Sequence, residues 1–147
     1  MTNFKLSSLV SAEPTKFGQY AFVVVRFVIA AFWLNSDIPR WVALAAGHPQ
    51  ANGLVRNLFG PSMVVPLTYF FTLLETLGAI ALILGLATRL VSVWGVIEFA
   101  ITGASGVLFG IPALMKDFGL LAGALVLLLN GSAVLSLDGL LSKRASK

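Results

Sequence analysis

The sequence predicts an all-α integral membrane protein that forms a bundle of four transmembrane helices with both termini in the cytoplasm. Of its 147 residues, 58% are hydrophobic and only 11% are charged, which is more apolar than an ordinary soluble domain. Four apolar segments are each long enough to cross a bilayer, and Lys and Arg gather on one side of them. So short a chain leaves room for one domain, so residues 1–147 are expected to fold as a single unit.

Four segments have the length and composition of membrane-spanning helices. A helix needs about 20 mainly apolar residues to cross a hydrocarbon core that is roughly 30 Å thick. Segments of this kind occupy 17–34, 63–86, 90–110 and 117–137. Only a short turn separates the second from the third, and Pro112 breaks the chain before the fourth. We therefore expect two antiparallel hairpins.

The longest gap between these segments is 35–62. It contains several Pro and Gly residues, which are typical of turns and loops. The sequence predicts an outer loop here, with two short surface helices near 39–46 and 52–59.

The distribution of basic residues predicts the orientation. One side of the predicted spans carries six Lys and Arg residues and the other carries three, the two sets being Lys5, Lys16, Arg89, Lys143, Arg144 and Lys147 against Arg40, Arg56 and Lys116. By the positive-inside rule the first set is cytoplasmic, which predicts a multi-pass protein of the cell membrane with a retained N-terminal tail. Nucleic acid is not an expected partner, because DNA-binding proteins gather basic residues on one face.

Three ionisable residues lie inside the apolar segments: Arg26, Glu75 and Glu98. Each would cost roughly 2.5 to 3.5 kcal/mol at the centre of a lipid-exposed helix, so all three are expected to face the interior of the bundle. The rise per residue places them at a similar depth, which predicts one shared polar layer near the middle of the membrane. They are the candidate catalytic residues.

Helical spacing supports inward-facing polar stripes. On each of three spans, polar or aromatic residues recur three, four or seven positions apart, as on one face of a helix. These stripes are Gln19, Arg26 and Trp33; Thr68, Thr72 and Glu75; and Trp94, Glu98, Thr102 and Ser105.

The buried charges have two main interpretations, which the residues alone leave open. In the first, Arg26 forms a buried salt bridge with one glutamate that only fixes helix register. In the second, the cluster handles protons or a quinone, because one arginine cannot neutralise two carboxylates and one carboxyl would then hold a proton. Binding of lipid or another substrate is a further possibility.

The composition limits the redox chemistry of the chain itself. It has no cysteine and a single histidine, His48, so thiol chemistry, iron–sulfur ligation and bis-histidine haem ligation are excluded, and no metal site is expected. Any redox turnover would need a bound quinone or a partner subunit.

Several short motifs, in order, resemble the DoxX/DoxD family of small four-helix membrane proteins. The resemblance spans residues 20–138 and is carried by an Arg in the first span, a Glu in the second and three later features: Gly78, the run from Leu84 to Arg89, and Asn130-Gly131 followed by Leu135-Ser136-Leu137-Asp138. By position, Arg26, Glu75 and Arg89 match family positions. The DoxD branch is the larger subunit of an archaeal thiosulfate:quinone oxidoreductase.

This resemblance implies a membrane subunit of a quinone-linked respiratory or sulfur-oxidising complex, with quinone as the possible non-covalent cofactor. Arg40, Arg56 and His48 in the outer loop could attract an anion such as thiosulfate. Trp33 and Trp94 could flank a quinone ring. The expected partners are membrane lipid and other membrane or extracytoplasmic subunits. The alternative is a noncatalytic accessory subunit that stabilises a larger membrane complex.

Overall fold

The computed structural model describes residues 16–50, 53–110, 116–131 and 134–145, and all of its regular elements are helical. The predicted N-terminal tail and Pro112 lie outside these ranges. The elements, in chain order, are α2 (Lys16–Ala45), α3 (Gly53–Phe59), the 3-10 helix η1 (Pro61–Met63), α4 (Val64–Leu84), α5 (Thr88–Leu108), α6 (Asp117–Asn130) and α7 (Leu137–Ala145).

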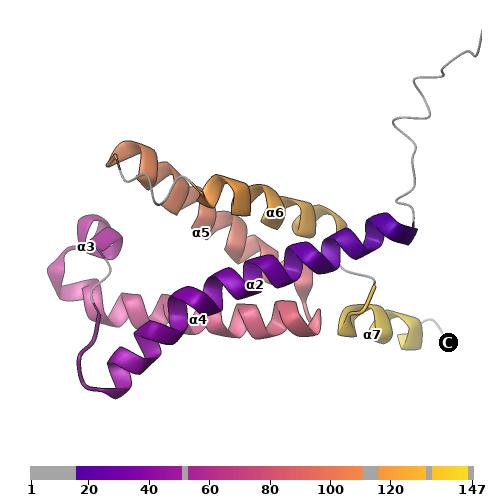
Figure 1. Ribbon diagram of the computed structural model, residues 1–147, viewed down its shortest axis with the longest axis horizontal. Coiled ribbons are helices and arrows are strands. Elements are labelled where there is room, and N and C mark those ends of the chain that lie inside the picture. The colour runs from indigo at the N-terminus through magenta and orange to yellow at the C-terminus, as the bar shows by residue number, and fades with distance from the viewer. Residues whose placement is uncertain (1–15, 51–52, 111–115, 132–133, 146–147) are drawn as a thin grey trace, which may run out of the picture.

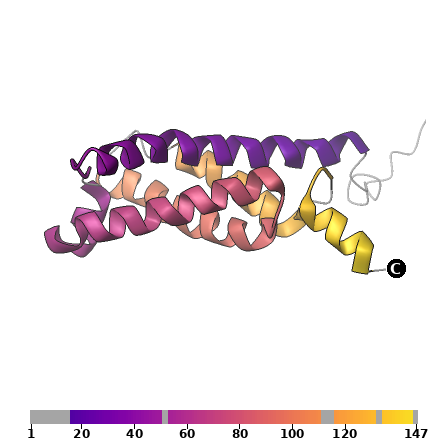
Figure 2. The same ribbon diagram turned by 90° about the horizontal axis from the view of Figure 1, so that it is seen from below.

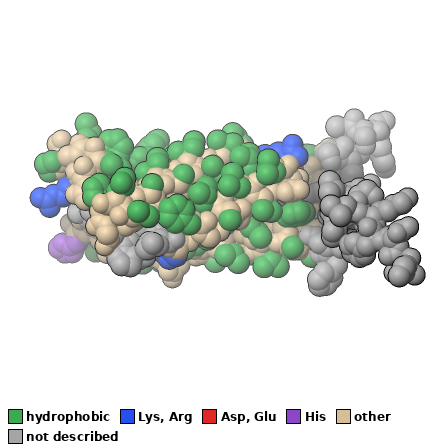
Figure 3. Space-filling model, turned by 90° about the horizontal axis from the view of Figure 1, so that it is seen from above, with side chains coloured by type: hydrophobic (Ala, Val, Ile, Leu, Met, Phe, Trp, Pro, Cys, Tyr) green, Lys and Arg blue, Asp and Glu red, His purple; other side chains and the backbone are tan. Residues whose placement is uncertain are grey.

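Three helical stretches within the described residues are long and apolar enough to cross a membrane: Gln19–Ala45, Pro61–Leu84 and Thr88–Leu108. The fourth apolar helix, α6, has only 14 residues. Hydrophobic side chains cover the length of the face seen in Figure 3, and few Lys or Arg side chains interrupt them. An all-α chain with three long apolar helices and one shorter one is consistent with a small helical membrane bundle.

The helices pack as two pairs, α2 with α4 and α5 with α6 (Figures 1 and 2). Helix α2 runs antiparallel to α4, because Arg26 contacts Leu82 near one end of the pair and Arg40 contacts Thr72 toward the other. The tight α4–α5 turn joins the pairs at one end. From that turn they diverge toward α3, which lies at the opposite end (Figure 1).

The prediction that the first span ends at residue 34 is wrong. Helix α2 continues to Ala45 with Pro39 inside it, so there is one long helix in place of a span and a separate surface helix near 39–46. Proline removes one backbone donor, but the side chains around it anchor this part of α2 to α4, as described below. The helix ends just before Gly47, whose φ of 75° suits glycine. The second predicted surface helix, near 52–59, corresponds to α3.

The fourth predicted span, 117–137, is also shorter in the structure. Helix α6 ends at Asn130, and Gly131 follows with a φ of 68°. Residues 134–136, which precede α7, are not helical. The other helix ends match the prediction to within two residues, since α4 ends at Leu84 and α5 spans Thr88–Leu108.

Trp33 is at the centre of the hydrophobic core, where α2, α4, α5 and α6 meet. Its side chain is fully buried and stacks on Phe99, with ring centroids 5.8 Å apart. Gly78 makes room for it, because a Cβ at that position would lie 2.9 Å from Cζ3 of Trp33. Ile29, Leu82 and Leu127 complete this layer, which fills the space between the two helix pairs.

Candidate functional site

A cavity of about 280 Å³ lies between the two helix pairs, on the α3 side of the Trp33 core. Residues from α2, α3, α4, α5 and the start of α6 line it. Its apolar wall includes Phe32, Phe71 and Trp94 together with Leu54 and Leu58 of α3. Its polar wall contains Ser36, Arg40, Thr68, Glu75, Glu98, Thr102, Lys116 and Asp117. A largely apolar pocket with a few convergent polar groups is the usual form of a small-molecule site.

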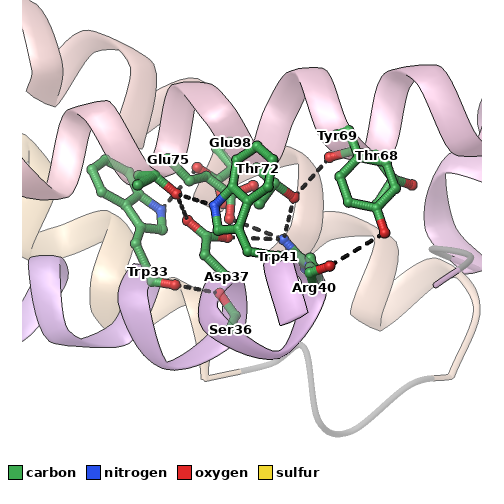
Figure 4. Close-up of polar contacts among 11 residues, drawn as sticks. Trp33, Ser36, Asp37, Arg40, Trp41, Thr68, Tyr69, Thr72, Glu75 and Glu98 are labelled. Carbon is green, nitrogen blue, oxygen red and sulfur yellow. Dashed lines mark hydrogen bonds and ion pairs between the residues drawn. The ribbon is translucent and has the colours of Figure 1, made fainter. Parts of the chain in front are cut away.

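Arg40 holds the polar cluster on the α2–α4 side of the cavity (Figure 4). Its Nη1 lies 3.2 Å from Oδ1 of Asp37, 3.2 Å from Oε2 of Glu75 and 3.3 Å from Oγ1 of Thr72. Asp37 is completely buried, and the Glu75 side chain is 8% exposed. The guanidinium therefore bridges two carboxylates from neighbouring helices, a strong type of contact where solvent is excluded.

Asp37 is a site residue that the sequence interpretation missed. The Thr76 hydroxyl donates to its Oδ2 at 2.9 Å, and Nε1 of Trp41 donates to Thr76 Oγ1 at 2.9 Å. Asp37 and Glu75 both contact Nη1 of Arg40, so their carboxyl groups lie on the same guanidinium. Asp37 falls four residues after Trp33, so extending the predicted stripe of the first span past residue 34 would have found it.

Glu98 faces the same cavity from α5. Nε1 of Trp33 donates to Oε2 of Glu98 at 3.0 Å, which fixes the carboxyl group against the core. Thr102 lies one turn later and donates its hydroxyl to the backbone oxygen of Glu98. Trp94, Glu98 and Thr102 all line the cavity, as their predicted common helix face requires.

Two buried donors in the cavity wall have no hydrogen-bond partner among the residues that the structure describes: Oγ1 of Thr68 and Nε1 of Trp94. Thr68 is only 2% exposed, and the Trp94 ring stacks on Phe71 at 5.7 Å. Buried polar groups are nearly always paired, and an unpaired one costs about 1 to 3 kcal/mol. These two donors are therefore available to a molecule with hydrogen-bond acceptors, either water or a ligand.

The cavity also has an acidic balance of ionisable groups. Glu75, Glu98 and Asp117 line it together with two cations, Arg40 and Lys116. The Lys116 ammonium lies 3.4 Å from Oδ1 of Asp117 and 4.9 Å from the ring centroid of Phe32. With every group ionised, the wall would carry one excess negative charge, which opposes the binding of an anion.

The structure does not bring Arg26 to the two glutamates, which corrects the prediction of a single Arg26–Glu75–Glu98 layer. Its Nε donates to the carbonyl of Leu82 at 2.8 Å, and its guanidinium also reaches the carbonyls of Ile83, Val134 and Leu135. Leu82 lies about 10 Å along α4 from Glu75. Arg26 therefore lies at the end of the bundle where the α4–α5 turn is. The arginine that contacts Glu75 is Arg40 instead.

Asp138 lies at the same end and caps the start of α5. Its carboxylate accepts hydrogen bonds from the backbone amides of Ala87 at 2.8 Å and Thr88 at 2.9 Å, and its own amide donates to the Gly85 carbonyl at 3.0 Å. The run 84–89 and the segment 135–138, which were two separate sequence motifs, therefore meet in one polar cluster with Arg26.

The remaining predicted binding residues divide between the cavity and the surface. Arg40 and Trp94 line the cavity, and Trp33 contacts it through Glu98. Arg56 lies on the exposed face of α3 and His48 in the exposed segment after α2, and neither lines the cavity. Within the described ranges, no group of three or more His, Cys, Asp or Glu side chains is placed to hold a metal ion.

Comparisons with protein-family models, with curated proteins and with solved structures find no match for this chain. The description of its site therefore rests on the cavity itself, and its resemblance to the DoxX/DoxD family rests on the sequence motifs alone.

Proposed function

We propose that this chain is the membrane subunit of a quinone-linked oxidoreductase related to the DoxX/DoxD family, and that its cavity binds a quinone head group. The observation that carries the proposal is the pair of unpartnered donors, Thr68 Oγ1 and Trp94 Nε1, in an apolar wall beside Glu75 and Glu98. A quinone ring presents two carbonyl acceptors and otherwise an apolar surface, which suits both features.

The size and charge of the cavity favour this ligand class over the others considered. A volume of about 280 Å³ is at the lower limit for small-molecule sites, so it suits one ring rather than a whole lipid. Thiosulfate and similar anions fit poorly, because the acidic groups outnumber the cations in the wall. Arg56 and His48, the surface residues predicted to attract such an anion, do not line the described cavity.

A bound quinone would supply two-electron, two-proton redox chemistry. The chain's own part would be to bind the ring through Thr68 and Trp94 and to hold protons on the carboxyl groups of Glu75 and Glu98. Arg40 would keep Glu75 and Asp37 in position between α2 and α4. The chain has no cysteine and one histidine, so the electrons would come from a partner protein.

We also propose that the chain crosses the cell membrane four times, with both termini in the cytoplasm. The start of α2 and the whole of α7 lie at the same end of the molecule (Figure 1), as an even number of crossings requires. The fourth crossing would combine α6 with the residues between it and α7. Its 14 helical residues alone rise only about 21 Å.

A noncatalytic accessory subunit is the second candidate, and the ion pairs favour it. Arg40 joins α2 to α4 through Glu75, so the cluster could serve only to lock the register of these helices. In that case the cavity would have no ligand, and removing its unpartnered donors would stabilise the protein or leave it unchanged.

Quinone binding to the purified protein distinguishes the two candidates. Thr68→Val removes one donor with little change of shape, and Trp94→Phe removes the other donor together with one ring of the indole. Each should weaken binding of a short-chain quinone about tenfold, which corresponds to about 1.4 kcal/mol. Thr88→Val is the matched control, since Oγ1 of Thr88 is also buried and unpartnered but lies outside the cavity. Equal affinity for wild type and all three variants would exclude this cavity as the quinone site.

A further inference from the structure

Asp117 is a buried acid in the cavity wall that the proposed quinone site does not use. It is the first residue of α6, and its side chain is only 5% exposed. A carboxylate in the first turn of a helix is favoured by the helix dipole, which explains its position but not its place on a cavity wall. Lys116, its ion-pair partner, is 55% exposed and reaches solvent.

Three carboxyl groups line the cavity from different helices: Asp117 from α6, Glu98 from α5 and Glu75 from α4. Glu98 on α5 is within electrostatic range of both Asp117 and Asp37, and Glu75 on α4 interacts with Glu98 and Asp37. The cations near them are Lys116 and Arg40. A cavity of about 280 Å³ has room for several water molecules to bridge such groups.

Toward the α4–α5 turn, the described side chains of the hydrophobic core close the cavity. Beyond Glu98 and Glu75, the fully buried side chains of Trp33 and Phe99, together with Ile29 and Leu82, fill the space between the helix pairs. Trp33 also donates its only ring N–H to Glu98, so it offers no acceptor for a proton travelling farther. Among the residues that the structure describes, no polar route leads from the acids through this core, and the cavity that they line lies on its α3 side.

We infer that Asp117 admits protons to the cavity from the α3 side of the membrane. This inference rests on the proposed function and adds to it the source and the direction of the protons. A proton from water on that side binds a carboxylate oxygen of Asp117, passes through cavity water to Glu98, and is replaced on Asp117 by the next. No electron moves in this step, and the unpartnered hydroxyl of Thr68 lies in the same cavity to meet the ligand.

Hydrogen–deuterium exchange of the buried carboxyl groups tests the inference on the full-length protein in detergent. The infrared C=O band of a protonated carboxyl shifts on exchange, and its assignment follows from its loss in Glu98→Gln or Glu75→Gln. After rapid dilution into D₂O, Asp117→Asn should slow this shift by about 100-fold, the lower range of what a positioned proton-transfer group contributes. Asp117→Glu keeps a carboxyl group there and should restore fast exchange.

Asp138→Asn is the matched control, because it makes the same change at the other end of the bundle. It should leave the exchange rate unchanged, and a loosened fold would speed exchange rather than slow it. Equal rates in Asp117→Asn and wild type would overturn the inference, as would the lack of any protonated carboxyl band. Quinone affinity is measured separately with the Thr68 and Trp94 variants, so failure here is distinguishable from failure of the proposed function.

Discussion

Arg26 supplies hydrogen bonds at a place where the backbone cannot. Helix α6 stops early, and a non-helical segment in an apolar setting leaves carbonyl groups without helical partners. The Arg26 guanidinium donates to two such carbonyls and to two at the end of α4, namely Val134 and Leu135 with Leu82 and Ile83. A planar group with five N–H donors is suited to this task.

Lysine at position 26 should not perform the role of Arg26, although it keeps the positive charge. An ammonium on a flexible stem cannot reach four carbonyls in a fork, so Arg26→Lys should lower the free energy of unfolding by about 3 kcal/mol. Arg89→Lys is the control, because Arg89 is exposed and makes a 3.4 Å contact with the Leu129 carbonyl; it should cost less than about 0.5 kcal/mol. Denaturant unfolding in one detergent measures both, and equal stabilities would disprove the bridging role of Arg26.

The sequence predicted the inward faces of Glu75 and Glu98 but not the partner of either. Periodicity reports which side of a helix is buried, and Thr68, Thr72 and Glu75 are indeed buried together. It does not report which distant residue lies opposite. Arg26 meets carbonyls 56 and 108 residues away, and Glu75 meets Arg40 across 35 residues, so these pairings depend on how the helices are stacked.

At the scale of helices, the unpredicted feature was the continuation of α2 through Pro39. A proline next to charged residues normally indicates the end of a span. Here Asp37, Arg40 and Trp41 all bond to α4, so tertiary contacts compensate for the backbone hydrogen bond that Pro39 lacks. Close packing of the same two helices depends on Gly78, which the Trp33 ring touches.

The contact between α2 and α4 should be sensitive to one methyl group. In Gly78→Ala, the new Cβ would lie 2.9 Å from the Trp33 ring and 3.3 Å from Val91, so the helices must separate, and we expect a loss of about 1 to 3 kcal/mol. Gly119→Ala on α6 meets nothing within 4 Å and should be neutral or stabilising, because alanine favours helix. Thermal unfolding of both variants checks this, and a stable Gly78→Ala would mean that Trp33 is loosely packed.

The whole molecule has two ends with different chemistry. One end is a structural polar cluster that consists of Arg26, Asp138 and the α4–α5 turn. At the other end the helix pairs diverge toward α3 (Figure 1), and α3 residues line the cavity. The proposed orientation places this polar cluster on the cytoplasmic side and the cavity toward the outside.

Labelling of single cysteines can establish this orientation, since the chain contains no cysteine of its own. In intact cells, a membrane-impermeant maleimide should label His48→Cys, in the exposed segment after α2, but not Ser142→Cys in α7. Both should react after lysis. Labelling of the two positions from the same side would contradict the four-crossing topology, and the reverse pattern would invert it.

The brevity of α6 has a consequence for the lipids around the protein. Helices α4 and α5 have 21 residues each and rise about 31 Å, which matches a hydrocarbon core, whereas α6 rises about 21 Å. In the proposed four-crossing topology, the flank of the bundle formed by α6 would be in hydrophobic mismatch, and the acyl chains beside it would have to shorten or tilt, at a fraction of a kcal/mol per Å. Bilayers of shorter chains should raise the melting temperature of the protein, and a neighbouring subunit could relieve the same strain by covering this flank.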